Sequence, residues 1–155
     1  MCLSLFKHIL SGRTDMNNWE RMKAGRLYNA DSKDLEKYHS FGMETCDKFN
    51  RTPLWMKKRK QRLLEKLIPS AKDGGAVIFA PFYCEYGVNI HFGKGCFVNY
   101  NCTFLDCAPI TLEDGVWVGA NVTIATPCHP FLSDERLPQQ YPDGFHDLEY
   151  AKPIH

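Results

Sequence analysis

Two spacings of apolar residues divide the chain. Between residues 17 and 67 apolar side chains recur every three or four positions and glycine and proline are rare, which predicts helices. A short helix comes first, Asp31 and Ser32 are suited to cap a second, and Thr52 with Pro53 resembles the start of a third. The expected inward face of the second helix carries Leu35, Tyr38, Phe41, Thr45 and Phe49.

From Ile78 onward the spacing changes to six residues. Small or apolar side chains hold every sixth position, with one two-residue slip before Ile110. Neither a helix nor a hairpin strand keeps this spacing, whereas short strands joined by tight turns into triangular coils do. We therefore expect each sixth residue to point into one stacked interior column, and a run of antiparallel strands is the alternative. The series is Ile78, Cys84, Ile90, Cys96, Cys102, Ala108, then Ile110, Val116, Val122 and Cys128.

Charge and cysteine content narrow the function classes. The 19 Lys and Arg nearly balance the 18 Asp and Glu, so we expect no nucleic-acid or membrane partner. The basic run at 57–62 is interpreted as a solvated helix face, because no aromatic side chains interleave it. The seven cysteines have no CxxC spacing, which favours free thiols in the cytoplasm and no metal site. The apolar opening at 1–15 is shorter than the ~20 residues of a membrane span and is expected to be an extension.

Three strings resemble one enzyme family. Residues 81–130, PFYCEYGVNIHFGKGCFVNYNCTFLDCAPITLEDGVWVGANVTIATPCHP, resemble the maltose, galactoside and nodulation-type sugar O-acetyltransferases. Residues 22–35, MKAGRLYNADSKDL, resemble the helical segment of that family, and LEYAKPIH at 148–155 resembles its next landmark.

The resemblance implies a mainly β fold. This is a left-handed parallel β-helix of hexapeptide repeats, incomplete in this chain, with an N-terminal α-helical cap. The cap segment would be 16–69, and the partial β-helix with an acceptor-site loop would be 70–155. Members usually form homotrimers with active sites at subunit interfaces. Left-handedness follows from the resemblance alone, because general topology favours right-handed crossovers.

The implied activity is acetyl transfer from acetyl-CoA to a sugar hydroxyl. That reaction needs a base for the hydroxyl proton, and an imidazole with a pKa near its ordinary value of about 6.5 suits the task. His129 matches the catalytic histidine of the family in its H-P pair. His91 is the rival but lies next to the inward Ile90, so a structural or surface role is expected for it, and His146 lies in a loop of undetermined register.

Four polar residues match acceptor-site positions of the family. They are Glu85, Asn99, Asp106 and Glu149, and each could instead be an ordinary turn residue. Cys107 is a departure, because some members carry a second acidic residue there. The identity of the sugar is therefore left open.

Ile154 resembles the first inward residue of a further hexapeptide. The resemblance implies that most coenzyme A contacts lie beyond His155, so we expect a truncated form with little or no activity on its own. A non-catalytic interaction module is the alternative. A zinc carbonic anhydrase is disfavoured, because the chain lacks the closely spaced histidine pair of such sites.

Overall fold

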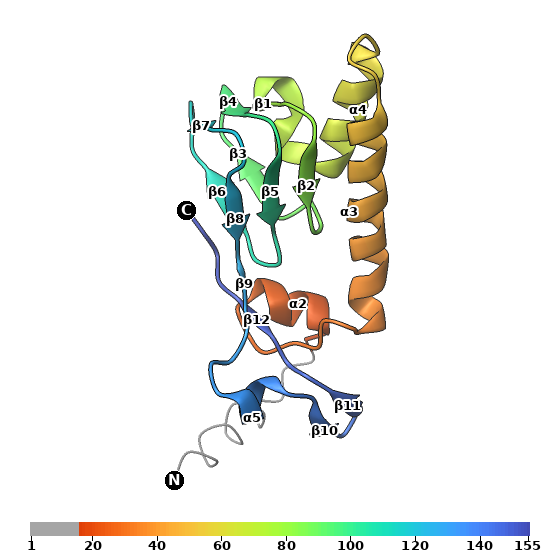
Figure 1. The fold of residues 1–155 in the computed structure, drawn as a ribbon, viewed down its shortest axis with the longest axis vertical. Coiled ribbons are helices and arrows are strands. Elements are labelled where there is room, and N and C mark those ends of the chain that lie inside the picture. The colour runs from red at the N-terminus through yellow and green to blue at the C-terminus, as the bar shows by residue number, and fades with distance from the viewer. Residues whose placement is uncertain (1–15) are drawn as a thin grey trace.

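The computed structural model describes residues 16–155, so the predicted extension at 1–15 lies outside the described residues. Helices form the first part of the described chain and short strands form the rest (Figure 1). No helix within 16–155 combines the length and the apolar character that crossing a membrane would require. The helical elements of the first part are α2 (Asn18–Lys23), α3 (Lys33–Arg51), α4 (Lys57–Leu67) and the 3-10 helix η1 (Pro69–Gly74).

The helix boundaries follow from capping and from one proline. Asn17 and Glu20 form a reciprocal capping box at α2, and Ser32 precedes α3 as expected. The expectation that Thr52 starts a third helix is wrong, because Thr52 ends α3. Its backbone is extended, as the following Pro53 favours, and its hydroxyl donates to the Lys48 carbonyl at 2.6 Å.

The repeat forms three parallel sheets with strand orders β1-β4-β7, β2-β5-β8 and β3-β6. Paired residues are 20 apart in sequence, as in Ala76 with Cys96 and Phe97 with Trp117. The chain therefore winds in three-sided turns, and each turn lies on the preceding one. The strands are β1 (Ala76–Ile78), β2 (Phe82–Cys84), β3 (Ile90–Phe92), β4 (Cys96–Val98), β5 (Cys102–Leu105), β6 (Ile110–Leu112), β7 (Trp117–Val118) and β8 (Thr123–Ala125).

The expectation of one column of residues six apart is wrong. Ile90, Cys96 and Cys102 are all buried, but they belong to three different sheets. Six residues make one strand and one turn, which form one of the three sides of a coil. A side chain therefore stacks on its equivalent in the next coil, 20 residues later, and not on the residue six positions away. The two-residue slip also recurs in each turn, from Phe82 to Ile90 and again from Cys102 to Ile110.

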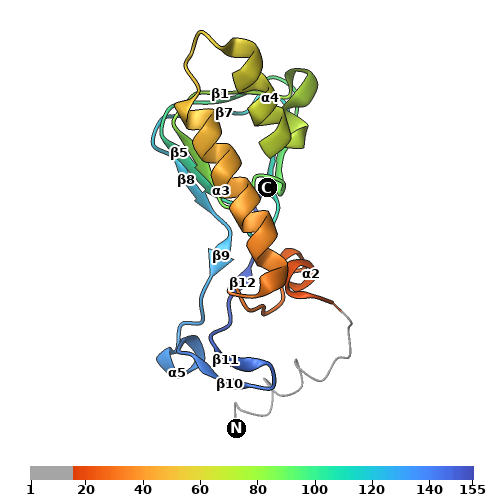
Figure 2. The same cartoon turned by 90° about the vertical axis from the view of Figure 1, so that its right-hand side faces the viewer.

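The helices cover one side of the coils. α3 lies along β2, and α4 packs against α3 (Figures 1 and 2). The approach of α3 is close at Gly42, where an added Cβ would lie 2.5 Å from the Glu85 carbonyl oxygen. This contact brings the middle of α3 next to the turn that follows β2.

A long excursion separates β9 (Pro127–Cys128) from its antiparallel partner β12 (Tyr150–Ala151). It contains α5 (Ser133–Arg136), β10 (Gln139–Tyr141) and β11 (Gly144–His146). Both views place it at the end of the molecule away from β1 and β7 (Figures 1 and 2). The chain then returns to the coils, where Ile154 pairs in parallel with the buried Ile110. This is the register that the sequence predicts, although 37% of Ile154 is exposed.

Candidate active site

The backbone places Glu149 between Tyr28 and His129. In the β9–β12 ladder Cys128 faces Tyr150, so the next opposed pair is His129 and Glu149. On its other side Glu149 forms an antiparallel bridge with Tyr28, with N–H···O distances of 2.9 and 3.0 Å. Three segments far apart in sequence thus meet at one carboxylate.

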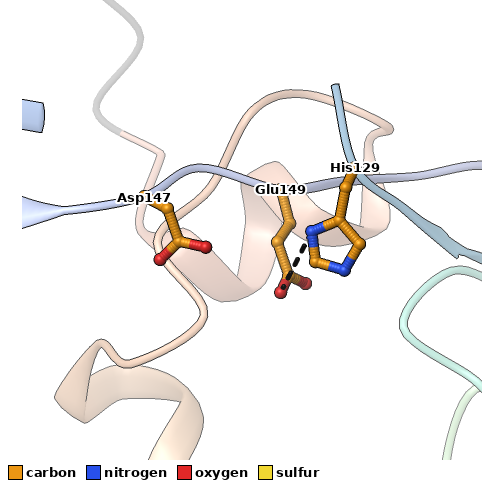
Figure 3. Close-up of side chains that lie close together, drawn as sticks. All are labelled: His129, Asp147 and Glu149. Atoms are coloured by element: carbon orange, nitrogen blue, oxygen red, sulfur yellow. Dashed lines mark ion pairs between the residues drawn. The ribbon is translucent and has the colours of Figure 1, made fainter. Parts of the chain in front are cut away.

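The side chains continue this arrangement (Figure 3). Tyr28 donates its hydroxyl to Glu149 Oε2 at 3.0 Å, and Glu149 Oε1 lies 3.8 Å from His129 Nδ1. Burial, together with the nearby Cys107 and Glu149, raises the pKa of Tyr28 far above its ordinary value, so this phenol remains a donor. His129 is half exposed and its Nε2 points away from the carboxylate (Figure 3). A half-exposed histidine with a carboxylate 3.8 Å from its Nδ1 has the groups that a general base needs.

Asp147 lies on the other side of Glu149 from His129 (Figure 3). One ligand atom each from His129, Asp147 and Glu149 fall within 4.8 Å of one another. Within residues 16–155 this is the group whose spacing could accommodate a cation.

A cavity of about 340 Å³ opens beside Glu149. It also contains Glu85, whose Oε1 lies 3.1 Å from His39 Nε2. Sequence reasoning missed His39, although it lies four residues after the buried Leu35 and hence on nearly the same face of α3. The lining residues are Tyr28, Ala30, Asp31, Ser32, Glu36, His39, Glu85, Tyr86, Cys107 and Glu149.

Asp106 and Cys107 have different surroundings. The Asp106 side chain is fully buried and accepts backbone N–H groups of Glu85, Tyr86 and Asn89 at 2.8–3.2 Å. It therefore holds the turn that carries Glu85. Burial raises the pKa of Asp106, although these N–H groups partly offset the effect. Cys107 faces the cavity, and burial raises the pKa of its thiol to about 12, so it offers a neutral group.

The remaining predicted residues lie apart from this cavity. Asn99 is half-buried after β4 and its Oδ1 accepts the Tyr100 N–H at 2.8 Å. Neither Asn99 nor Asp106 is among the described residues that line the cavity. His91 is the exposed middle residue of β3, and His146 pairs with Asp143 at 3.0 Å in the excursion. The structure thus gathers Glu85 and Glu149 at the cavity with His129 alongside, while a substrate role for Asn99 and Asp106 stays a prediction.

Comparison with known proteins identifies the family. Residues 21–72 match the maltose acetyltransferase hexapeptide capping motif. The chain is 37% identical over 118 residues to nodulation protein L of Rhizobium leguminosarum bv. viciae, a match that covers 76% of this chain and 61% of that protein. A maltose O-acetyltransferase structure from Clostridium difficile 630 is 30% identical with a TM-score of 0.79, covering 90% of this chain and 70% of that one. The chain belongs to the hexapeptide-repeat sugar O-acetyltransferase family.

Coenzyme A occurs among the structures of this family. A hexapeptide-repeat acetyltransferase of Vibrio cholerae O1 biovar eltor was solved with acetyl-CoA, and it is similar to this chain with a TM-score of 0.68 and 25% identity, over 89% of this chain and 69% of that one. The chain spans about three fifths of the length of the curated nodulation relative. The family match, the sequence identity and the structural similarity together confirm the predicted family.

Proposed function

We propose that this protein is an acetyl-CoA-dependent O-acetyltransferase that acts on a hydroxyl of a maltose-, glucose- or galactoside-like sugar. The observation that carries the proposal is the Tyr28–Glu149–His129 arrangement beside the cavity of about 340 Å³. Family membership supports it, because relatives are named for maltose and galactoside acetylation.

His129 is the general base of the proposed reaction. Its Nε2 takes the proton of the acceptor hydroxyl while that oxygen attacks the thioester carbonyl carbon. The carbon–sulfur bond then breaks, and coenzyme A leaves as a thiolate that recovers the proton from His129. Glu149 positions the ring through Nδ1 and stabilises the imidazolium that forms in between, and Tyr28 fixes the carboxylate. Acetyl-CoA supplies the activated acetyl group.

The acceptor would lie in the cavity. Sugars carry hydroxyl donors and no charge, so carboxylate oxygens are suitable partners for them. Glu85 and Glu149 provide such oxygens there, and we retain Asn99 as a proposed acceptor-site residue from its match to the family. Asp106 matches the family as well, but it is fully buried, so we propose that it serves the acceptor site by holding the turn that carries Glu85. His129 is half exposed and is not part of the cavity lining, so we propose that the acetyl group approaches from outside the cavity.

We further propose a left-handed parallel β-helix, a homotrimer and a cytoplasmic location. The three parallel sheets with a 20-residue repeat support the β-helix, and its hand follows from the family likeness. Three exposed aromatic side chains on the coils, Phe79, Tyr100 and Trp117, support self-association. The six cysteines of the described chain are free, which suits a reducing compartment.

Binding and transfer separate this proposal from a non-catalytic interaction module. The experiment is calorimetric titration of the purified chain with acetyl-CoA, followed by mass spectrometry of glucose, maltose and a galactoside incubated with both. We expect saturable acetyl-CoA binding and one acetyl group added to at least one sugar, because Tyr28, Glu149 and His129 all lie within the described residues. The same measurement tests the opposite prediction from the sequence, that a truncated chain has little or no activity on its own. A chain that binds no acetyl-CoA, even as an oligomer, would instead be an interaction module.

A further inference from the structure

A second cavity, of about 330 Å³, lies between α3 and β2 and exposes two thiols to one space. Cys46 of α3 and Cys84 of β2 both contribute to its lining, together with Met43, Asp47, Asn50, Tyr83, Glu85 and Leu105. Each cysteine is otherwise buried, with 4% of its surface exposed. Any small reagent that enters this cavity therefore meets both cysteine residues.

The helix is fixed on the strand on both sides of the two cysteines. Gly42 packs on the Glu85 carbonyl. The Asn50 side chain donates to the Phe82 carbonyl at 2.7 Å and accepts the Phe82 N–H at 2.9 Å. Gly42, Cys46 and Asn50 are four residues apart and so share one helix face. Cys46 lies between these two anchors, and its thiol donates to the Phe82 carbonyl at 2.9 Å.

Cys46 and Cys84 belong to one buried cluster and differ in acidity. The influence of the neighbouring Cys84 thiol lowers the pKa of Cys46 despite its burial. The neighbouring Cys46 thiol, followed by burial, raises the pKa of Cys84. Cys46 is therefore the nucleophile of the pair, because the thiolate is the reactive form.

We propose that Cys46 and Cys84 are a peroxide-oxidisable thiol pair that closes to a disulfide between α3 and β2. The Cys46 thiolate attacks one oxygen of hydrogen peroxide, the O–O bond breaks and the hydroxide released takes a proton to form water. The sulfur of Cys84 then attacks the Cys46 sulfenic acid, the S–O bond breaks, and the second hydroxide leaves as water with the Cys84 proton. Two thiols lose two electrons in total, and the peroxide is reduced to two waters.

Among the described residues, no other cysteine lines this cavity beside Cys46 and Cys84. Cys96 and Cys102 donate to the carbonyls of Glu113 and Gly119 at 3.0 and 3.1 Å within the coils. Cys128 is half-buried and more accessible than Cys46, so it serves as an internal reference for peroxide exposure. The pair is also placed to affect the acceptor site, because Glu85 follows Cys84 and lines both cavities.

Peptide mapping of the full chain tests the proposal. After hydrogen peroxide treatment, alkylation of free thiols and trypsin digestion without reductant, Cys46 lies alone in peptide 38–48 and Cys84 alone in peptide 73–94. We expect these two peptides to appear as one linked species that has lost two hydrogen atoms and that separates on reduction.

Variants assign the two roles. Cys84→Ser should leave a Cys46 sulfenic acid that dimedone traps, Cys46→Ser should leave Cys84 unoxidised, and Cys128→Ser should form the linked species as the wild type does. Absence of the linked species in the wild type, at peroxide levels that oxidise Cys128, would overturn the proposal. Because the readout is covalent, this result is independent of whether the protein transfers acetyl groups.

Discussion

Asp106 shows how a buried carboxylate can position a site without facing it. Its two oxygens accept three backbone N–H groups from residues 85–89, and its own carbonyl accepts the Asn89 side-chain amide at 2.8 Å. These bonds compensate for burial of the charge. The consequence is a fixed backbone at Glu85, and therefore a fixed carboxylate at the cavity.

Asp106→Asn tests this role. The substituted amide turns an NH₂ group toward backbone donors, so at least one N–H loses its acceptor, and we expect a loss of about 1–3 kcal/mol in the free energy of unfolding. Urea denaturation at neutral pH measures it. Asp114→Asn is the matched control, since exposed Asp114 accepts a single backbone N–H from Lys94, and its effect should be smaller. Equal stability of Asp106→Asn and the wild type would contradict the assignment.

The site could be predicted from sequence only where a motif marks it. His129 and Glu149 were identified by their motifs, and an antiparallel register then brings them together. Residue type and spacing do not reveal which carboxylate is enclosed, so Asp106 and Glu85 looked equivalent although one is buried and the other lines the cavity. His39 was missed because it lies in the helical segment and meets Glu85 only after α3 packs on β2.

The excursion between β9 and β12 depends on a small hairpin of its own. His146 Nε2 of β11 donates to Asp143 Oδ1 at 3.0 Å, and the His146 ring stacks on Tyr141 of β10 with ring centroids 4.7 Å apart. Burial alone would lower the pKa of His146, but the Asp143 carboxylate and the Asp147 carbonyl outweigh it and raise the pKa. The hairpin therefore favours a protonated imidazole.

This predicts a pH dependence of stability. The folded pKa of His146 is raised, so its contribution is fully present below the unfolded value of about 6.5 and is lost as pH rises through the folded value. Because Asp143 is largely exposed, the contribution should stay below about 1 kcal/mol. NMR titration should show a His146 pKa above its ordinary value that Asp143→Asn lowers. An unchanged pKa in that variant would show that Asp143 does not set it.

The sequence predicted the type of each element better than its boundaries and its stacking partners. Apolar spacing gave the helices and the repeat, because burial of one face imposes a period. It could not show that Thr52 closes α3, since the same residue type favours a helix start and the deciding influence is the extended backbone before Pro53. The expectation of a single column of residues six apart was wrong for a similar reason. A period of six residues does not reveal how many strands complete one turn of the coil.

Across the coils, the exposed aromatic side chains of Phe79, Tyr100 and Trp117 form a row with the half-buried Phe97. The Phe79 ring contacts those of Phe97 and Tyr100, with centroids 5.1 and 4.8 Å apart. The Phe97 ring in turn contacts that of Trp117, with centroids 6.3 Å apart. Trp117 is 80% exposed. A clustered aromatic surface of this kind is typical of protein interfaces, which supports the proposed homotrimer.

Trp117→Ala should therefore weaken self-association. We expect a trimer mass for the wild type by light scattering after size exclusion, and a shift toward monomer in the variant at the same concentration, with at least about a tenfold higher dissociation constant if Trp117 is a central contact. Trp55→Ala is the control, because Trp55 is 79% exposed but belongs to the connection between α3 and α4 and has no ring contact with the row among those of the described residues. A monomeric wild type, or equal dissociation of both variants, would contradict the interface.

Base catalysis by His129 is the central claim, and the rate of acetyl transfer to a sugar by His129→Ala tests it most directly. We predict a rate at least about 100-fold below the wild type with acetyl-CoA binding retained, because the variant lacks the proton acceptor. His91→Ala, which removes an exposed imidazole from β3, should transfer at the wild-type rate. Transfer by His129→Ala at the wild-type rate would contradict the account.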